Sequence, residues 1–555
     1  MHKYAIGIDY GTESGRVLIV NVRNGDIAGS SVIPYTHGVI TETLPTDEET
    51  TIPPEFALQH PGDYLEVLHK GIPAAIRNAA VSPEQIVGIG VDFTSSTMVV
   101  TDDELEPLCF KKQYENNPHA WVKLWKHHGP SYEAQRLYEQ AVQQNQQWLK
   151  RYGSNISTEW FIPKCLEILN QDAQLFHEAG LFLEAGDWIV SRLTNRIVRS
   201  NCSLGFKALW HEKDGFPEAF LSSISPELGS MIHTKLRGEI GKVGERAGSL
   251  SAEMADALGL PSELPVGVAI IDAHAAILGI GASEPHQFTM VMGTSTCHMM
   301  LNEQEIPVPG ISGVVKDAII PGLYAYEAGQ SAVGDLFGWY VKQVPCTLEQ
   351  EAAQSQMSVF ELLEKKASQK KPGESGLVAL DWHNGNRSIL SDSDLSGLLI
   401  GLTLTTKPED IYRAYLEATA FGAKVILDNY EQGGLQVNEV FACGGLPQKN
   451  ELLMQIYADI LNKDIYVSAS DYAPAVGAAI LGAVAAGEPL GGFDTIKEAV
   501  DHMKQPFLKS YHPIEKNVAV YAQLFRIYKQ LHDHYGKRNE IMKQLKQARL
   551  STCSH

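Results

Sequence analysis

The 555-residue chain has few cysteines, no long apolar run and no excess of positive charge. Its seven cysteines form no CxxC pair, which is typical of a reducing compartment and of thiols that pack inside a core. The longest apolar run, AVGAAILGAVAAG, is shorter than the ~20 residues that a membrane-spanning helix needs. Asp9 and Glu13 interrupt the first apolar stretch, so we expect no signal peptide there. These absences predict a cytoplasmic protein with no membrane partner.

The sequence features of common nucleotide-binding and nucleic-acid-binding proteins are missing as well. The formal net charge is −21 and no Lys/Arg cluster occurs, so we expect no nucleic-acid partner. Neither a P-loop, GxxxxGK[ST], nor the protein-kinase set of motifs is found. If the chain binds a nucleotide, it must therefore use another kind of phosphate site.

The length exceeds what one hydrophobic core holds and predicts two large domains or three smaller ones. Apolar alternation in the first part of the chain predicts strands over residues 4–9, 16–22, 27–35 and 86–94 and a helix over 61–80, which Asp63 would cap. Residues 115–152 are rich in Gln, His, Tyr and Trp and predict a helical insertion on the first domain. His127 and His128 within it have no assignable chemistry, and we expect them at a solvated helix end.

The pattern of the first strands returns near residue 265. YGTESGRVLIVN and MGTSTCHMMLN each place a Gly-Thr turn between two apolar strands, at Gly11-Thr12 and Gly293-Thr294. The later part continues with helices near 409–430, from about Gln448, over 473–487 and over 514–547, and with strands over 439–445 and 464–470. We interpret this as two similar halves, residues 1–284 and 285–555. A chance match of two common turns is the alternative.

Both turns carry groups that suit an anion. Consecutive backbone amides converge on an oxyanion in such turns, and two turns facing each other could hold a triphosphate from both sides. Asp9 ends the strand before the first turn, where a carboxylate beside phosphates would hold Mg²⁺ directly or through water. The alternative is a plain hairpin with an aspartate cap.

Two further segments could carry chemistry. In CGGLPQKN, Gly444 and Gly445 end a strand and let backbone approach a flat ligand such as adenine, unless this is only a strand-to-helix turn. Asp272 in IIDAHAAILG ends an apolar strand and opens a helix, where it could accept a proton from a hydroxyl nucleophile or simply cap the helix. His274 beside it lacks a third ligand at useful spacing, so we reject zinc.

Across nearly its whole length the chain resembles the FGGY carbohydrate kinases. DYGTESGR and MGTST resemble their two phosphate motifs, CGGLPQKN their adenosine motif, and GVAIIDAHAAILG the segment with the catalytic base. PHAWVKLWKHHGP, FIPKCLEIL, EAGDWIV, SNCSLGFKALW and YEAGQSAVGDLFGW resemble the branch of that family that acts on L-ribulose.

The resemblance implies an α/β fold of two actin-like (ribonuclease H-like) ATPase domains with a cleft between them, sugar on the first and nucleotide on the second. It implies ATP and Mg²⁺ as cofactors and transfer of a phosphoryl group to O5 of L-ribulose, for catabolism of L-arabinose. Carried over by motif, Asp272 would be the base and Ser95, Lys207 and Glu327 would contact the sugar, while the nucleotide would meet Gly11, Thr12, Gly293, Thr294, Gly444, Gly445, Gln448 and Asn450.

Several alternatives stay open. Lys207 could be a surface lysine, although its apolar neighbours suggest partial burial, and Glu327 could pair with a nearby cation. Ser95-Ser96 departs from the small apolar residue expected there, which puts the preferred pentulose epimer in doubt. Trp125, Trp210 and Trp339 are expected in the core or in a cleft wall. A kinase for another polyol, or an actin-like conformational ATPase, would share the phosphate motifs, and a homodimer is not decided by the sequence.

Overall fold

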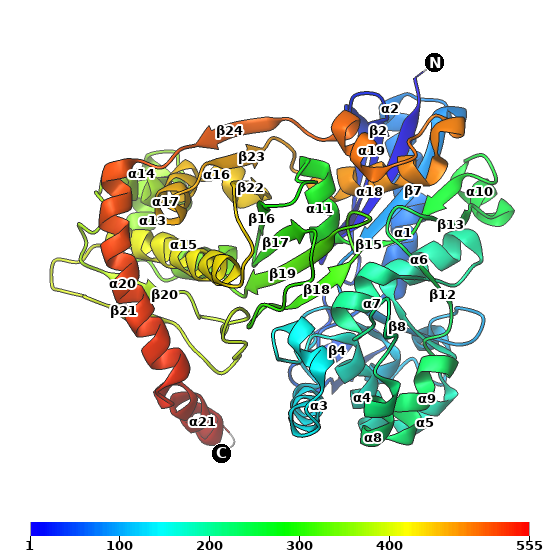
Figure 1. Cartoon of the computed structure of the whole chain (residues 1–555), viewed down its shortest axis with the longest axis horizontal. Coiled ribbons are helices and arrows are strands. Elements are labelled where there is room, and N and C mark those ends of the chain that lie inside the picture. Colours follow the sequence, from blue (N-terminus) through cyan, green and yellow to red (C-terminus); the bar gives the residue numbers. More distant parts are fainter. Residues whose placement is uncertain (1, 554–555) are drawn as a thin grey trace.

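The computed structural model describes residues 2–553. Within this range two large mixed sheets form the centres of two lobes, and a third, smaller sheet lies with a group of helices at the lower right of Figure 1. Among the described residues, no helix combines the length and apolar character needed to cross a membrane.

The first sheet has the strand order β13-β14-β7-β1-β2-β3, with β15 also paired to β7. β2 runs antiparallel to both β1 and β3, whereas β7 runs parallel to β1. The strands are β1 (Tyr4–Tyr10), β2 (Ser14–Asn21), β3 (Ile27–Pro34), β7 (Ile86–Phe93), β13 (Arg246–Ser249), β14 (Pro265–Gly267) and β15 (Ile270–Ile271). The strands predicted at the start of the chain are therefore confirmed.

The second sheet, in order β18-β19-β17-β16-β22-β23-β24, repeats this topology. β19, β17 and β16 are antiparallel, and β22 and β23 then add in parallel, as β7 and β14 do in the first sheet. Its strands are β16 (Gln287–Met292), β17 (Thr296–Asn302), β18 (Gly313–Lys316), β19 (Tyr324–Gln330), β22 (Glu439–Cys443), β23 (Ile465–Ser468) and β24 (Phe507–Tyr511). The predicted internal repeat is thus confirmed, with the two Gly-Thr turns at equivalent positions.

The small sheet, in order β10-β8-β9-β6, packs with helices around a separate apolar cluster. Its elements are β6 (Leu58–Gln59), β8 (Met98–Thr101), β9 (Val122–Lys123), β10 (Leu181–Glu184), α3 (Ser131–Gln143), α4 (Phe161–Gln171), α5 (Ala173–Glu178), α8 (Glu218–Ile224) and α9 (Pro226–Thr234). The segment 115–152, expected to be helical, contributes both α3 and the strand β9 to this unit.

The helix expected over 61–80 forms with an irregular middle. It consists of α1 (Pro61–Glu66), a π-helical turn (Val67–Gly71) and α2 (Ile72–Ala79). The cap is His60, not Asp63 as expected, because the Nδ1 atom of His60 accepts the hydrogen bond from the backbone N–H of Gly62 at 3.0 Å.

Helices from both halves of the chain cover the first sheet. One face packs on α1, α2 and α6 (Ala185–Thr194). The other face packs on α11 (Asp272–Ile280) and on α18 (Ala473–Ala486), which belongs to the second half of the sequence. α18 approaches closely because Gly7, Gly88 and Gly90 face it: a Cβ atom on any of the three would overlap its backbone. Packing therefore crosses the boundary predicted near residue 284.

The remaining helices complete the two lobes. They are α7 (Asn201–Lys207), α10 (Ala252–Leu258), α12 (Gly334–Val341), α13 (Cys346–Gln354), α14 (Val359–Ser368), α15 (Pro408–Gln432), α16 (Gly445–Lys449), α17 (Glu451–Leu461), α19 (Ile496–Met503), α20 (Glu515–Lys537) and α21 (Ile541–Cys553). Three short two-stranded ladders pair β4 (Thr43–Leu44) with β5 (Asp47–Thr51), β11 (Val198–Ser200) with β12 (Glu239–Gly241), and β20 (Val378–Leu380) with β21 (Leu398–Ile400). In Figure 1, α20 runs along the outer side of the second lobe.

Candidate active site

The two Gly-Thr turns are each held by residues outside their own hairpin. In the turn of Gly11 and Thr12, which joins β1 to β2, the Oγ1 atom of Thr12 accepts a hydrogen bond from Trp125 Nε1 at 3.0 Å. The turn of Gly293 and Thr294, which joins β16 to β17, is exposed, and its carbonyl oxygens accept backbone N–H bonds from Gly334 and Val333 at 3.1 and 2.9 Å. Such external support is what a preorganised anion site requires.

Three aspartates lie near one another at the ends of strands of the first sheet. Asp9 on β1 is in register with Asp92 on β7, and Asp92 pairs with Ile270 of β15, two residues before Asp272. Among residues 2–553, neither oxygen of Asp92 has a hydrogen-bond partner, although the residue is fully buried. Burial, together with the neighbouring carboxylates of Asp9 and Asp272, raises the pKa of Asp92 well above its ordinary value.

Asp92 was missed by the sequence analysis as a site residue. The sequence did contain a signal, because the apolar strand IVGIGVDFT ends in an acid just as the first strand does. Asp9 itself is engaged: its Oδ2 atom lies 2.9 Å from Arg16 Nη1.

Asp272 is the first residue of α11, and the N-cap position belongs to Ile271. The Oδ1 atom of Asp272 accepts the backbone N–H of Ala273 at 2.7 Å. Burial, and next the charge of Asp9, raise the pKa of Asp272 to about 7. A carboxylate with such a pKa can both take and release a proton near neutral pH, as a general base must.

Lys207 and Glu327 meet at the junction of the two lobes. Lys207 ends α7, Glu327 lies on β19 of the second sheet, and Lys207 Nζ is 2.6 Å from Glu327 Oε1. Both side chains are buried, so Lys207 is not a surface lysine. Glu327 does pair with a nearby cation, as one alternative proposed, and that cation is Lys207. The pair offers donors and acceptors on both sides of the junction, as recognition of a polyol needs.

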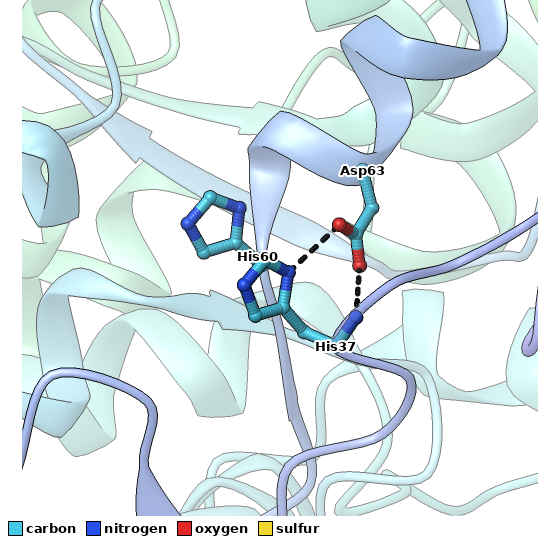
Figure 2. A group of neighbouring side chains, drawn as sticks. All are labelled: His37, His60 and Asp63. Atoms are coloured by element: carbon cyan, nitrogen blue, oxygen red, sulfur yellow. Dashed lines mark hydrogen bonds and ion pairs between the residues drawn. The ribbon is translucent and has the colours of Figure 1, made fainter.

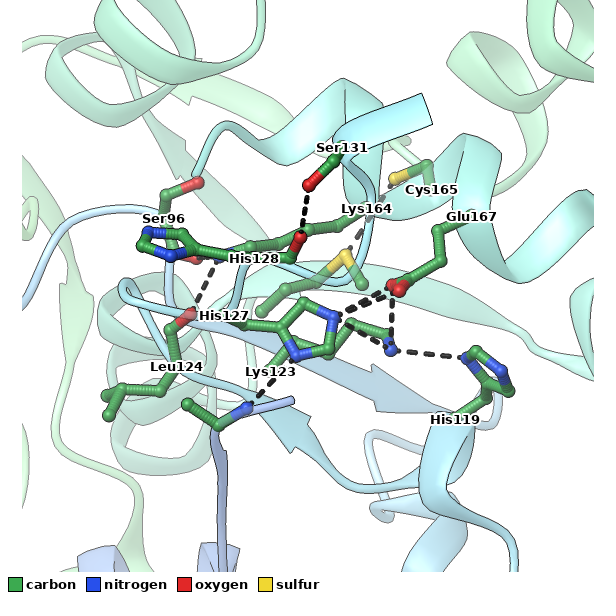
Figure 3. A network of polar contacts seen from close by, with 12 residues as sticks. Ser96, His119, Lys123, Leu124, His127, His128, Ser131, Lys164, Cys165 and Glu167 are labelled. Atoms are coloured by element: carbon green, nitrogen blue, oxygen red, sulfur yellow. Dashed lines mark hydrogen bonds and ion pairs between the residues drawn. The ribbon is translucent and has the colours of Figure 1, made fainter. Parts of the chain in front are cut away.

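Ser95 lies in the turn between β7 and β8, and a buried lysine holds the next residue of that turn. Lys164 Nζ donates to the backbone oxygens of Ser96 at 2.6 Å and Leu124 at 2.8 Å (Figure 3). Ser96 has a φ of 56°, in the left-handed region that non-glycine residues rarely adopt. Burial lowers the pKa of Lys164 to about 7.

The expectation for His127 was wrong, because this residue is fully buried in the same network (Figure 3). Its Nε2 atom is 2.9 Å from Glu167 Oε2, which is also 3.0 Å from Lys123 Nζ. Burial, and next the charge of Lys123, lower the pKa of His127 to about 3, so the imidazole is neutral. His128 is partly exposed and lies 3.2 Å from Glu159.

The residues predicted for adenosine lie together after β22. Gly444 has a φ of 101° and lies against the backbone of Met292, so only glycine fits there. A helix begins at Gly445, earlier than the predicted Gln448. Gln448 Nε2 donates to the Ser468 carbonyl at 3.2 Å.

Asn450 is turned toward the protein. Its side chain caps α17 by accepting the Leu453 N–H at 2.8 Å, and it is nearly buried. Of the three tryptophans expected in the core or in a cleft wall, Trp339 is 46% exposed and is therefore not in the core, whereas Trp125 and Trp210 are partly buried.

A two-histidine, one-aspartate cluster lies near the first turn, since Gln59, the residue before His60, donates to the Thr12 carbonyl. Figure 2 shows the stacked rings of His37 and His60 beside Asp63. Both oxygens of Asp63 bond to His37, at 2.8 Å to its Nδ1 and 3.1 Å to its backbone N–H. Because His60 Nδ1 also serves as the helix cap, these hydrogen bonds account for the cluster without a metal.

A second cross-lobe contact lies near Thr12. Arg387, between β20 and β21, pairs with Glu159, before α4, at 3.1 Å, and its guanidinium lies 5.9 Å from the ring of Trp125. Since Trp125 bonds to Thr12, the ion pair connects the second lobe to the first Gly-Thr turn.

The chain belongs to the FGGY family of carbohydrate kinases. The model of the N-terminal domain of that family matches residues 4–279, and the model of its C-terminal domain matches residues 288–486. This assignment makes the protein an enzyme that transfers a phosphoryl group to a carbohydrate and uses ATP as its second substrate.

Individual relatives and solved structures show which proteins the chain is similar to. Ribulokinase of Staphylococcus aureus strain MSSA476 is 53% identical over 548 residues, which make up 99% of this chain and 99% of that one. The ligand-bound xylulose kinase of Lactobacillus acidophilus matches the structure with a TM-score of 0.78 at 17% identity, over 97% of this chain and 100% of that one. The xylulose kinase of Rhodospirillum rubrum gives a TM-score of 0.76 at 21% identity, over 96% and 98%. The two structures establish the shared two-lobed fold.

Proposed function

We propose that this chain transfers the γ-phosphoryl group of ATP to O5 of L-ribulose, giving L-ribulose 5-phosphate and ADP, in the catabolism of L-arabinose. The proposal is supported by the 53% identity to a ribulokinase over nearly the whole length of both chains. The observation in the structure that carries it is the Lys207–Glu327 pair at the junction of two lobes that each bear a Gly-Thr turn, with Asp272 near enough for both charges to act on its pKa.

In this proposal the sugar lies at the junction and is recognised by hydrogen bonds. The ammonium of Lys207 donates to sugar oxygens, the carboxylate of Glu327 accepts from sugar hydroxyls, and the turn of Ser95 adds backbone groups. Because Lys207 and Glu327 come from different lobes, the sugar site is complete only when both lobes are in place. Closure over the substrates also excludes water, which would otherwise compete as a phosphoryl acceptor.

The reaction is an in-line displacement. As O5 attacks the γ-phosphorus, Asp272 takes the proton of the hydroxyl group, and the bond from that phosphorus to the β,γ-bridging oxygen breaks, leaving ADP. The turns of Gly11-Thr12 and Gly293-Thr294 are proposed to hold the phosphates, with the amides of Thr12 and Thr294 stabilising the charge that spreads over the transferring group. The N–H groups of Gly11 and Gly293 close the turns themselves, by donating to the carbonyls of Ser14 at 3.1 Å and Ser295 at 2.9 Å. Gly444, Gly445, Gln448 and Asn450 are proposed for the adenosine, where Gly444 and Gly445 supply close backbone approach.

Residues of the first sheet also suit a Mg²⁺ ion. Asp92 brings two buried carboxylate oxygens that have no partner among residues 2–553, and Asp9 lies beside it. Mg²⁺ prefers oxygen ligands of this kind, and a dication would relieve the like charge that raises the pKa of Asp92. We therefore infer that Asp9 and Asp92 hold Mg²⁺, which would neutralise phosphate charge when bound.

The proposed function is tested by ADP production from ATP and Mg²⁺ with L-ribulose, D-ribulose, L-xylulose, D-xylulose, glycerol or no sugar. We expect the strongest stimulation with L-ribulose. Stimulation by xylulose or glycerol alone would assign a different substrate and leave the kinase chemistry unchanged. ATP turnover that does not depend on sugar would contradict the proposal of a sugar kinase. The ranking of epimers also shows what Ser95-Ser96 contribute.

A cytoplasmic location and a homodimer remain predictions, which cell fractionation and light scattering would test.

A further inference from the structure

Glu327 has a second partner that the proposed reaction does not use. Its Oε1 atom faces Lys207, and its Oε2 atom lies 3.1 Å from the Nε2 atom of His274. His274 is fully buried and sits two residues after Asp272 on α11. One carboxylate is therefore held from both sides, by an ammonium on α7 and an imidazole on α11.

The other ring nitrogen of His274 is also engaged. Its Nδ1 atom lies 3.0 Å from the Sγ atom of Cys202, which is buried on α7. Burial lowers the pKa of His274 and raises the pKa of the Cys202 thiol, so both groups are neutral at physiological pH. Although burial opposes its ionisation, Lys207 and His274 together hold the pKa of Glu327 well below its usual range.

These charge states fix the direction of each hydrogen bond. A thiol can donate and an ionised carboxylate can only accept, so Cys202 donates its S–H to Nδ1, and His274 carries its proton on Nε2 and donates it to Glu327. The chain of bonds runs from α7 through α11 to β19 of the second sheet. It joins the helix that carries Asp272 to the strand that carries Glu327.

We propose that His274 is a positioning residue for the sugar site, which orients the carboxylate of Glu327, and that Cys202 sets the tautomer of His274 that can do so. This inference rests on the proposed function, in which Glu327 accepts hydrogen bonds from the sugar. Without the bond from His274, the carboxylate could rotate about its terminal torsion and present the wrong lone pairs to the sugar hydroxyls. An apolar residue would fill the same space beside Phe206, whose ring centre is 4.6 Å away, but would not orient Glu327.

The kinetic test compares His274→Leu, which keeps bulk and removes the donor, with His274→Gln, whose amide can still donate. We expect His274→Leu to raise KM for L-ribulose about 10- to 100-fold, with KM for ATP changed less than about twofold, and His274→Gln to restore most of the loss. Cys202→Ala should raise the sugar KM by a smaller factor, and Cys202→Ser should restore it. A His274→Leu enzyme with the wild-type sugar KM, or a Gln variant as impaired as the Leu variant, would overturn the proposal.

A matched control comes from His298, an equally buried histidine on the neighbouring strand β17. Its Nε2 atom bonds to Gln330 at 2.8 Å and does not contact Glu327. His298→Leu should reduce stability in the same way and leave the ratio of the two KM values unchanged. If it raises the sugar KM as His274→Leu does, the effect is one of folding and the proposal fails.

The tautomer can be measured without any variant. In protein labelled with ¹⁵N-histidine, we expect His274 to show a protonated Nε2 and an unprotonated Nδ1 at neutral pH, and the opposite tautomer would contradict the assignment. If the wild-type enzyme gives no ribulose-dependent ADP in the kinetic assay, the proposed function fails, and the positioning role falls with it. If the wild type is active and the variants match it, only the positioning role fails.

Discussion

At the scale of single residues, the site depends on how the charges of buried side chains are compensated. Asp9, Asp92 and Asp272 bring three carboxyl groups to the ends of β1, β7 and β15, and only some of these groups have a hydrogen-bonded neighbour. Lys207 and Glu327 are also buried, but they satisfy each other. Burial and like charge therefore raise the pKa of Asp92 and of Asp272, whereas the contact with Lys207 helps to keep Glu327 ionised.

The first prediction concerns the base. Asp272→Asn keeps an oxygen that can accept the N–H of Ala273 but cannot take a proton from the sugar. We expect turnover to fall by ~10²-fold or more while ATP affinity stays nearly unchanged. Steady-state kinetics and calorimetric titration with a non-hydrolysable ATP analogue measure the two effects. A variant with near-wild-type turnover would exclude Asp272 as the base.

The second prediction concerns the pH dependence of stability. Burial lowers the pKa of His298 to about 4, whereas an unfolded histidine titrates near ~6.5. Between these values the unfolded chain binds a proton that the folded chain does not, so the contribution of His298 is complete above pH ~6.5 and is lost as pH falls toward 4. Relative to His298→Gln, the wild type should lose about 2 kcal/mol of unfolding free energy between pH 7 and pH 4.5. Urea unfolding of both proteins across this range provides the measurement, and a constant difference would contradict the assigned shift.

At the scale of elements, α18 explains how the two halves of the sequence interlock. The helix is rich in Ala and Gly, and glycines on the strands and on α11 let backbones approach without side chains between them. The sequence predicted this helix from its apolar character, but not its partner. An amphipathic helix shows which face is buried, whereas this one is apolar on all sides and gives no such direction.

Other parts of the fold and site could be predicted to different degrees. The strands and the internal repeat were predictable because each strand is a local apolar run that ends in an acid or a glycine turn. The burial of His127 was not, because it depends on Glu167, which is 40 residues away on α4. Asp92 was missed because its importance comes from register with Asp9 across two strands. The acid that ends this strand is visible in the sequence, but its pairing with Asp9 is not, because contacts between distant segments leave no pattern in one sequence.

The third prediction tests the contact between α18 and β7. A Cβ atom at Gly90 would overlap the carbonyl oxygen of Ala478, so Gly90→Ala should force the helix away from the sheet and cost about 2–3 kcal/mol of unfolding free energy. Thermal or urea unfolding measures the loss. Gly338→Ala is the matched control, because a Cβ atom there on α12 meets nothing within 4 Å, and we expect it to be neutral or stabilising by about 0.5–1 kcal/mol. Equal effects at the two sites would contradict the packing described.

At the scale of the whole molecule, ion pairs join the two lobes around the proposed sugar site. Lys207–Glu327 and Arg387–Glu159 both span the junction, and Arg151 of the first lobe also reaches Glu305 of the second at 2.8 Å. Such pairs are stronger when water is excluded, so binding that brings the lobes together also strengthens the contacts that hold them. The site and the relative placement of the lobes are therefore coupled.

The fourth prediction is that Arg387 and Glu159 act as a pair in catalysis. Each of Arg387→Gln and Glu159→Gln should lower kcat/KM for L-ribulose by about three- to tenfold, and the double variant should be little worse than either one, since each removes the same contact. Arg196–Glu239 is a suitable control, because it is an exposed pair within the first lobe and its removal should leave kcat/KM unchanged. Independent, multiplying losses in the double variant would show that the two residues do not act together.

The position of α18 also affects how the protein is made. β1 and β7 leave the ribosome early, but the helix that covers their glycines, Ala473–Ala486, is translated several hundred residues later. At roughly 5–20 residues per second this interval lasts on the order of tens of seconds. During synthesis the part of the first sheet that α18 covers therefore stays exposed until most of the chain has emerged, and this surface is where a nascent chain would engage chaperones or a neighbouring chain on the same polysome.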